Sequence, residues 1–139
     1  MQCKKKIYIY IYIQHAWTAA ILKETIQGRS LTFTLRCGAS LITQRHLLTA
    51  AHCLFEEKTG QKRNDNEDLL VILGSNDPME STDGIERRII NFTHHPDYIY
   101  PQAYFDLAIA TLNEPIPQSA FKSARTICLP PKPVEDPGF

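Results

Sequence analysis

His52 stands where a short apolar run ends in small residues, within the segment 47–53 of sequence LLTAAHC. A buried strand that leads into a tight turn needs small side chains such as Ala50 and Ala51, because the backbone there approaches its neighbour closely. The turn would hold the imidazole at a fixed position on the rim of a core. An imidazole can transfer protons near neutral pH, although a histidine beside an apolar run is, on this pattern alone, more often structural than catalytic.

Two further segments change the interpretation of His52. CGASLI, at positions 37–42, lies upstream of it, and FDLAIA, at positions 105–110, lies downstream. In this order the three segments resemble the N-terminal half of the chymotrypsin/trypsin-like serine proteases, which have a CGGSLI strand, a TAAHC turn with the catalytic histidine, and a DIAL strand that opens with the catalytic aspartate. The TAAHC match is complete, and the resemblance is nearly continuous from Trp17 to Pro131.

The resemblance implies catalytic roles for His52 and Asp106. In this family a serine hydroxyl attacks a peptide carbonyl, the histidine takes its proton, and a buried aspartate fixes the tautomer of the imidazole and stabilises its cation. His52 would be the general base and Asp106 its orienting group. Because the two lie far apart in the sequence, only a folded barrel could bring them together. Without the histidine motif, Asp106 would be interpreted as a common turn residue.

The attacking serine is not found in this sequence. In the family it lies in a Gly-Asp-Ser-Gly-Gly turn that also builds the oxyanion hole, and no such segment occurs among the 139 residues. Active enzymes of the family also start with Ile-Val-Gly-Gly, which would fall near Lys4 to Ile7, where neither glycine is present. We therefore expect the isolated chain to be inactive.

Two functions fit these observations. The first is the N-terminal portion of a trypsin-like serine endopeptidase, which acts on protein or peptide substrates once a serine-bearing second barrel completes it. The second is a catalytically inactive homologue that binds a partner through its cleft loops. The presence of both His52 and Asp106 favours the enzyme, because a binding module has no need of them. A Gly-Asp-Ser-Gly-Gly segment further downstream in the transcript would decide between the two.

Short apolar segments at regular spacing predict an all-β fold, an antiparallel Greek-key barrel of about six strands between Trp17 and Leu112. By resemblance it would be the N-terminal barrel of a trypsin-like two-barrel fold. We expect an atypical N-terminal extension at 1–13, the barrel at 14–127, and a truncated inter-barrel connector at 128–139. The expected strands lie at residues 17–21, 32–35, 39–42, 47–49, 69–73, 85–92 and 107–112, with a short helical turn at His52.

The charge balance argues against two classes of partner. Fifteen Lys and Arg residues against fifteen Asp and Glu residues give zero formal net charge, so there is no electrostatic reason to bind nucleic acid or an anionic membrane. The longest strongly apolar run, at 7–13, is too short to cross a bilayer. It follows a basic patch, yet it lacks the small-residue cleavage site of a signal peptide. We expect a secreted protein whose signal peptide is not convincingly present in this chain.

Four cysteines occur in the chain, at positions 3, 37, 53 and 128. They show no Cys-x-x-Cys spacing, and no histidine is placed to complete a zinc set, so we expect no metal site. In the family the counterparts of Cys37 and Cys53 are bridged; two free thiols in a cytosolic protein are the alternative. By the same resemblance, Cys128 should find no disulfide partner in the barrel. Cys3 is a candidate partner for Cys128 only if the N-terminal segment folds back.

Three loop features carry weaker predictions. By resemblance, Tyr100, Ala103 and Tyr104 would flank the substrate cleft beside His52, although an aromatic surface turn is an equal alternative. Asn91 opens an Asn-Phe-Thr glycosylation triplet, which agrees with secretion. Residues 75–86 correspond to the calcium loop of some trypsins, but a serine stands where that loop begins with glutamate, so we expect a charged turn there and no cofactor.

Overall fold

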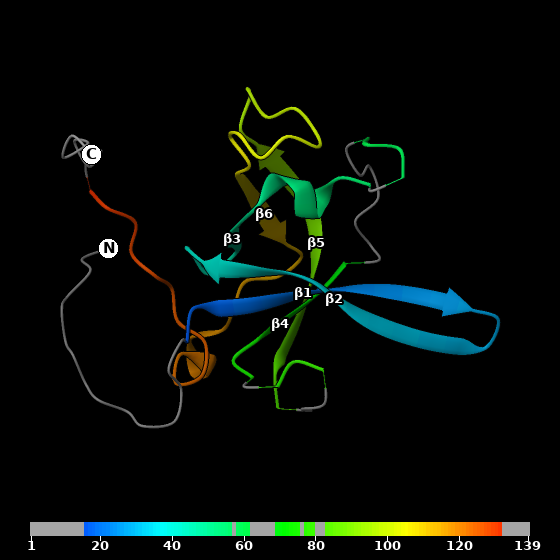
Figure 1. Cartoon of the computed structure of the whole chain (residues 1–139). Helices are drawn as coiled ribbons and strands as arrows, with labels where there is room; N and C mark the ends of the chain where they lie inside the picture. Colours follow the sequence, from blue (N-terminus) through cyan, green and yellow to red (C-terminus); the bar gives the residue numbers. More distant parts are fainter. Residues whose placement is uncertain (1–15, 57, 62–68, 76, 80–82, 132–139) are drawn as a thin grey trace.

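Six strands form the body of the molecule. The computed structural model describes residues 16–56, 58–61, 69–75, 77–79 and 83–131. The strands are β1 (Thr18–Gln27), β2 (Ser30–Leu41), β3 (His46–Thr49), β4 (Leu69–Leu73), β5 (Ile85–His94) and β6 (Ala108–Leu112), and the two short 3-10 helices are η1 (Ala51–Leu54) and η2 (Gln118–Ala120). The strands close into an antiparallel barrel in the order β1-β2-β3-β6-β5-β4 (Figure 1), which confirms the predicted fold class.

The strand order brings the end of β3 beside the start of β6. β3 and β4 are consecutive in the chain but are not neighbours, because β3 pairs with β6 and β4 pairs with β1. In the first of these ladders Thr49 pairs with Ala108. The residues just after β3, which include His52, therefore lie close to the residues just before β6, which include Asp106.

The barrel interior is filled by alternate residues of each strand, as the pleat of a strand requires. β4 is buried along its whole length, which explains its uninterrupted apolar sequence. Leu69, Val71 and Leu73 belong to the main core. Leu70 and Ile72 instead form a second, smaller cluster with Leu22, against which Ala20 and Phe33 pack.

The β1–β2 hairpin is longer than the sequence pattern predicted. β1 continues to Gln27, and the segments 32–35 and 39–42, predicted as separate strands, belong to the single strand β2, which ends one residue earlier, at Leu41. The hairpin turns at Gly28, which has a φ of 62°, and Figure 1 shows its tip extending away from the rest of the barrel.

A β-bulge explains why β2 looked like two strands. The ladder pairs Ile21 with Cys37 but the next residue, Leu22, with Leu35, so Arg36 is the extra residue. A bulge breaks the alternation of a strand without ending it. The periodicity of the sequence is therefore interrupted at Arg36 while the hydrogen-bonded ladder continues.

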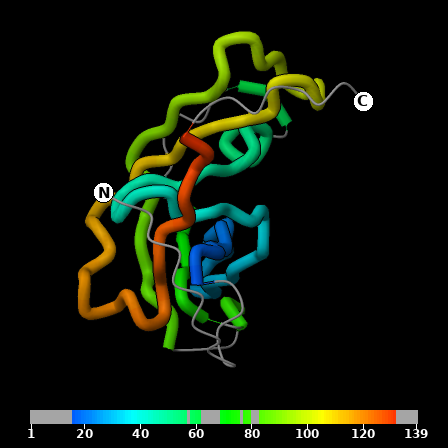
Figure 2. Tube along the Cα trace, turned by 90° about the vertical axis from the view of Figure 1, so that its left-hand side faces the viewer, coloured from blue at the N-terminus to red at the C-terminus, as the bar shows by residue number. Residues whose placement is uncertain are grey.

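The segment after β6 folds back against the barrel. Ile116 and Ala124 are buried in the main core, and the backbone N–H of Ile127 donates a hydrogen bond to the carbonyl of Leu41 at 2.8 Å. Figure 2 shows this segment, in orange and red, running back along the molecule. The predicted extension at 1–13 and residues 132–139 of the predicted connector lie outside the described residues. Within the described part of the chain, no helix is both long enough and apolar enough to cross a membrane.

Candidate active site

His52 lies on η1, the single helical turn that follows β3. The residues on either side of it, Ala51 and Cys53, are buried, whereas the side chain of His52 is 54% exposed. The small size of Ala51 lets the turn lie against the core, as the sequence predicted. The hydroxyl of Thr49 donates a hydrogen bond to the carbonyl of Gly38 at 2.9 Å and so ties the end of β3 to β2.

Asp106 receives two hydrogen bonds from His52. The backbone N–H of His52 lies 2.8 Å from Oδ1 of Asp106, and ring atom Nδ1 lies 2.6 Å from Oδ2. The Asp106 side chain is only 20% exposed. The structure thus brings together the two residues to which the sequence assigned the roles of base and orienting group.

The environment of Asp106 keeps its carboxyl group ionised. Burial acts to raise its pKa, but hydrogen bonds from the ring and the backbone of His52, the charge of His52 and a hydrogen bond from the Ala51 backbone outweigh burial, so the pKa is lowered. An ionised carboxylate can only accept hydrogen bonds. Nδ1 of His52 must therefore carry a proton, so Nε2 is the ring nitrogen that has the lone pair whenever the ring is uncharged.

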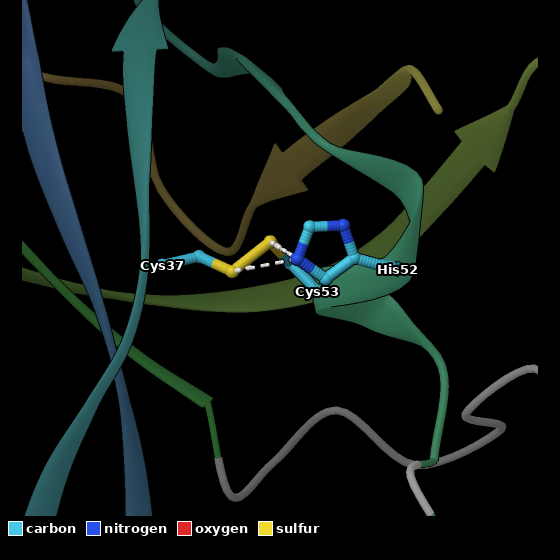
Figure 3. Close-up of side chains that lie close together, drawn as sticks. All are labelled: Cys37, His52 and Cys53. Carbon is cyan, nitrogen blue, oxygen red and sulfur yellow. Dashed lines mark hydrogen bonds between the residues drawn. A yellow bond between two sulfur atoms is a disulfide. The ribbon is translucent and has the colours of Figure 1, made fainter. Parts of the chain in front are cut away.

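A disulfide joins the histidine turn to β2. Cys37 and Cys53 are bonded, with their Cα atoms 6.1 Å apart, as the family resemblance implied. Because the two barrel cysteines are bonded to each other, Cys128 has no partner in the barrel, as expected, although it too is disulfide-bonded. Cys3 lies outside the described residues. Figure 3 shows Nε2 of His52 facing the bridge, 3.9 Å from Sγ of Cys37 and 3.7 Å from Sγ of Cys53.

Comparison with protein families agrees with this geometry. The sequence matches the family profile described as Trypsin over residues 12–138. The chain belongs to the trypsin family. The barrel, the bridged histidine turn and the His52–Asp106 pair are thus features of a trypsin-like serine protease domain.

Curated relatives of this trypsin-family chain are serine proteases of animals. Venom serine protease Bi-VSP of Bombus ignitus is 36% identical over 127 residues, which cover 86% of this chain and 30% of the relative. CLIP domain-containing serine protease B4 of Anopheles gambiae is 34% identical over 120 residues, 82% of this chain and 32% of the relative. Transmembrane protease serine 11E of Mus musculus is 35% identical over 95 residues, 68% of this chain and 20% of the relative. The chain thus spans a third or less of the length of these three relatives.

Arg36 is a positioning residue of this trypsin-family site that the sequence analysis missed. From the β2 bulge, its Nε donates a hydrogen bond to the carbonyl of Cys53 at 2.6 Å, and its Nη2 donates one to the carbonyl of Phe55 at 2.8 Å. The first carbonyl belongs to η1 itself and the second to the residue that directly follows it. A charged residue that interrupts an alternating strand next to Cys37 was the available signal.

Phe105 was also missed, although it directly precedes Asp106. Its φ is 56°, a left-handed conformation that is rare for a bulky side chain. The N–H of Leu107 bonds back to the carbonyl of Phe105 at 2.7 Å, and the Phe105 ring stacks on His95 with centroids 4.8 Å apart. This reversal of the chain places Asp106 between the loop and β6. Nothing in the residue type of Phe105 signals such a turn.

The predicted cleft loop has one packed residue and two exposed ones. Tyr100 stacks on Phe55, with ring centroids 5.8 Å apart. Ala103 and Tyr104 are exposed. These positions leave the predicted substrate contacts untested, but they assign Tyr100 a packing role as well.

Two remaining predictions of the sequence analysis fall on the surface. Asn91, the glycosylation candidate, is exposed on β5, and modification there stays a prediction. In the predicted charged turn at 75–86, residues 76 and 80–82 lie outside the described part of the chain. The expectation that no calcium ion binds this turn also stays a prediction.

Proposed function

We propose that this chain supplies the general base, His52, and its orienting group, Asp106, to a trypsin-like serine endopeptidase. The observation that carries the proposal is the 2.6 Å contact between Nδ1 of His52 and Oδ2 of Asp106. The nucleophilic serine, the oxyanion hole and the pocket for the substrate side chain would come from a second barrel. The intact pair favours this function over that of an inactive binding module.

In the proposed mechanism, Nε2 of His52 accepts the serine proton while the serine oxygen attacks the peptide carbonyl. The exposed face of the imidazole leaves room for the serine to approach. Asp106 keeps the proton on Nδ1 and stabilises the imidazolium that forms. The imidazolium then returns its proton to the leaving amine, and the cycle repeats with water as the attacking group.

We further propose that the protein acts outside the cell on protein or peptide substrates. The Cys37–Cys53 disulfide supports this, because such bridges persist in oxidising compartments. Among the relatives, one is named a venom serine protease and another a proclotting enzyme. The zero net charge of the chain agrees with partners other than nucleic acid.

The decisive experiment compares the isolated chain with a form joined to a serine-bearing barrel of the family. The joined form, with a correctly cleaved N-terminus, should hydrolyse a fluorogenic peptide and react with a serine-directed phosphonate. The isolated chain should do neither. Stoichiometric labelling of the isolated chain would contradict the assignment of the nucleophile to a second barrel, and a correctly folded joined form without hydrolysis would contradict the proposed function.

A further inference from the structure

Three potential metal ligands meet at the histidine turn. The two sulfurs of Cys37 and Cys53 and one ring nitrogen of His52 lie within 4.8 Å of one another. The sequence predicts no zinc set, because no histidine lies at a spacing from the cysteines that would complete one. The fold corrects that reason, because η1 and β2 bring one histidine and two cysteines to a single point (Figure 3). While the disulfide is intact, its sulfurs are not thiolates and cannot serve as strong ligands.

The nitrogen is already where a tetrahedral metal ion would need it. With Zn–S bonds of about 2.3 Å and Zn–N bonds of about 2.0 to 2.1 Å, tetrahedral angles separate a sulfur from a nitrogen by about 3.6 Å. Nε2 of His52 lies 3.9 Å and 3.7 Å from the two sulfurs. Only the sulfurs would have to part, to about 3.8 Å, once the bond between them is broken.

Asp106 prepares His52 to be a metal ligand. A metal-bound histidine usually donates its second ring N–H to a carboxylate, which fixes the tautomer and makes the ligating nitrogen more basic. Nδ1 of His52 makes this contact with Asp106 at 2.6 Å. Nε2, on the side of the sulfurs, is therefore the nitrogen with the free lone pair. The exposure of the ring leaves space for a water molecule as the fourth ligand.

The backbone that carries the three groups is held by bonds that do not involve the disulfide. Arg36 binds the carbonyl of Cys53, and Asp106 binds the backbone N–H of His52. On the other strand, Thr49 binds the carbonyl of Gly38, the neighbour of Cys37. These contacts would keep the three side chains together after reduction.

We propose that reduction of the Cys37–Cys53 disulfide creates a binding site for a thiophilic divalent cation such as Zn²⁺, with His52 as the third ligand. A phosphine reductant supplies the two electrons: phosphorus is oxidised to the phosphine oxide with an oxygen atom from water, and the protons of that water complete the two thiols. Metal binding then releases both thiol protons, so that two thiolates and one neutral imidazole balance the charge of the ion.

Occupation of this site would remove the proposed catalytic base, because the metal uses the same Nε2 lone pair that would accept the serine proton. The binding site itself rests on the geometry of the chain alone, so its test does not depend on the proposed function.

The test uses Co²⁺ as a spectroscopic probe of the 139-residue chain in a Cys3→Ser, Cys128→Ser background, which leaves only the two thiols of interest. After phosphine reduction, we expect one Co²⁺ per chain, with sulfur-to-cobalt charge transfer and the intense visible bands of tetrahedral cobalt. Added Zn²⁺ should displace Co²⁺ and remove these bands, because Zn²⁺ has a filled d shell and does not absorb visible light. The oxidised chain should show none of them.

Variants distinguish a three-ligand site that includes His52 from metal binding by the two cysteine thiols alone. Asp106→Asn should weaken binding by about 10- to 100-fold, the usual effect of losing a carboxylate behind a metal-bound histidine. His52→Ala should weaken it further and remove the tetrahedral bands. His46→Ala is the matched control, because the ring of His46, the first residue of β3, bonds to Thr43 and not to the bridge. This variant should bind the metal as the parent chain does.

Thiol alkylation, followed together with circular dichroism, tests the site even if reduction partly unfolds the chain. Zn²⁺ should protect both thiols from alkylation in the reduced parent chain but much less in His52→Ala, while circular dichroism reports the strand content. Absence of cobalt bands in the reduced chain would overturn the proposal. Equal binding or equal thiol protection in His52→Ala would also overturn it, because two cysteines alone would then account for the binding.

Discussion

Asp106 binds His52 at two points, one on the backbone and one on the ring. Oδ1 accepts the backbone N–H at 2.8 Å, and Oδ2 accepts the N–H of Nδ1 at 2.6 Å, across 54 positions of sequence. The backbone contact fixes the carboxylate relative to the residue whose ring it orients. Loss of the carboxylate charge should therefore affect both the tautomer of the imidazole and the position of the turn.

In a form of the protein completed by the serine-bearing barrel, Asp106→Asn should lower turnover by about 10⁴-fold, the effect known for this exchange in the well-studied Ser-His-Asp triad. The side chain keeps its shape, but its amide group can donate to Nδ1, which favours the wrong tautomer. Steady-state hydrolysis of a peptide substrate measures the loss. Near-normal turnover would show that Asp106 does not orient His52.

The double variant tests whether the two residues act as one unit. His52→Ala removes the base and should reduce turnover at least as much as Asp106→Asn does. Since an orienting group has no effect without the base, the double variant should be little worse than the worse single variant. Losses that multiplied would mean that the residues contribute independently, contrary to the proposed mechanism.

The lowered pKa of Asp106 predicts a pH dependence of stability. The folded chain holds this proton less tightly than the unfolded chain, whose carboxyl has the ordinary value of 3.8. Stabilisation by the charged group is thus complete above that pH and is lost as the pH falls through the lower folded-state pKa. Urea unfolding of the parent chain and of Asp106→Asn should show a difference in free energy that shrinks at acid pH. A difference that grew on acidification would refute the assignment.

Arg36 should stabilise the histidine turn through its two hydrogen bonds to backbone carbonyls. Arg36→Ala should reduce the free energy of unfolding by about 1.5 to 3 kcal/mol, the range for hydrogen bonds to charged groups. Arg36→Lys should restore only part of this, because an ammonium lacks the planar fork of donors. Arg29→Ala, at the exposed hairpin tip, is the control and should change stability by less than about 0.5 kcal/mol. Equal losses of stability in Arg36→Ala and Arg29→Ala would show that the two hydrogen bonds of Arg36 do not stabilise the histidine turn.

Gly28 should tolerate alanine poorly for a purely conformational reason. Its φ is 62°, yet a Cβ there would meet no atom within 4 Å. Gly28→Ala should therefore cost about 1 to 2 kcal/mol from the left-handed backbone alone. Gly38→Ala is the matched control, because that site is equally open and has no positive φ. Denaturant unfolding that showed equal losses for both variants would mean that the turn conformation is not the cause.

Local pattern sufficed for much of the fold and for the identities of the reactive residues. The uninterrupted apolar run at 69–73 predicted β4, because both faces of that strand are buried. Ala50 and Ala51, the small residues before His52, predicted a turn that packs closely against the core. These predictions succeeded because burial and close backbone approach restrict the residue types that a position accepts. That restriction produces a pattern that can be recognised within a few consecutive residues.

Tertiary structure decided what depends on groups distant in the chain. The bulge at Arg36 follows from the pairing of β2 with β1 and places a guanidinium at the histidine turn. The charged residue in an alternating strand indicates the interruption, but not which group its side chain contacts. The left-handed Phe105 is imposed by its surroundings against its own preference. The approach of His52 to Asp106 depends on strand order, because β3 pairs with β6. Distances across a closed barrel are set by the register of its ladders, and register is a relation between strands that no single segment contains.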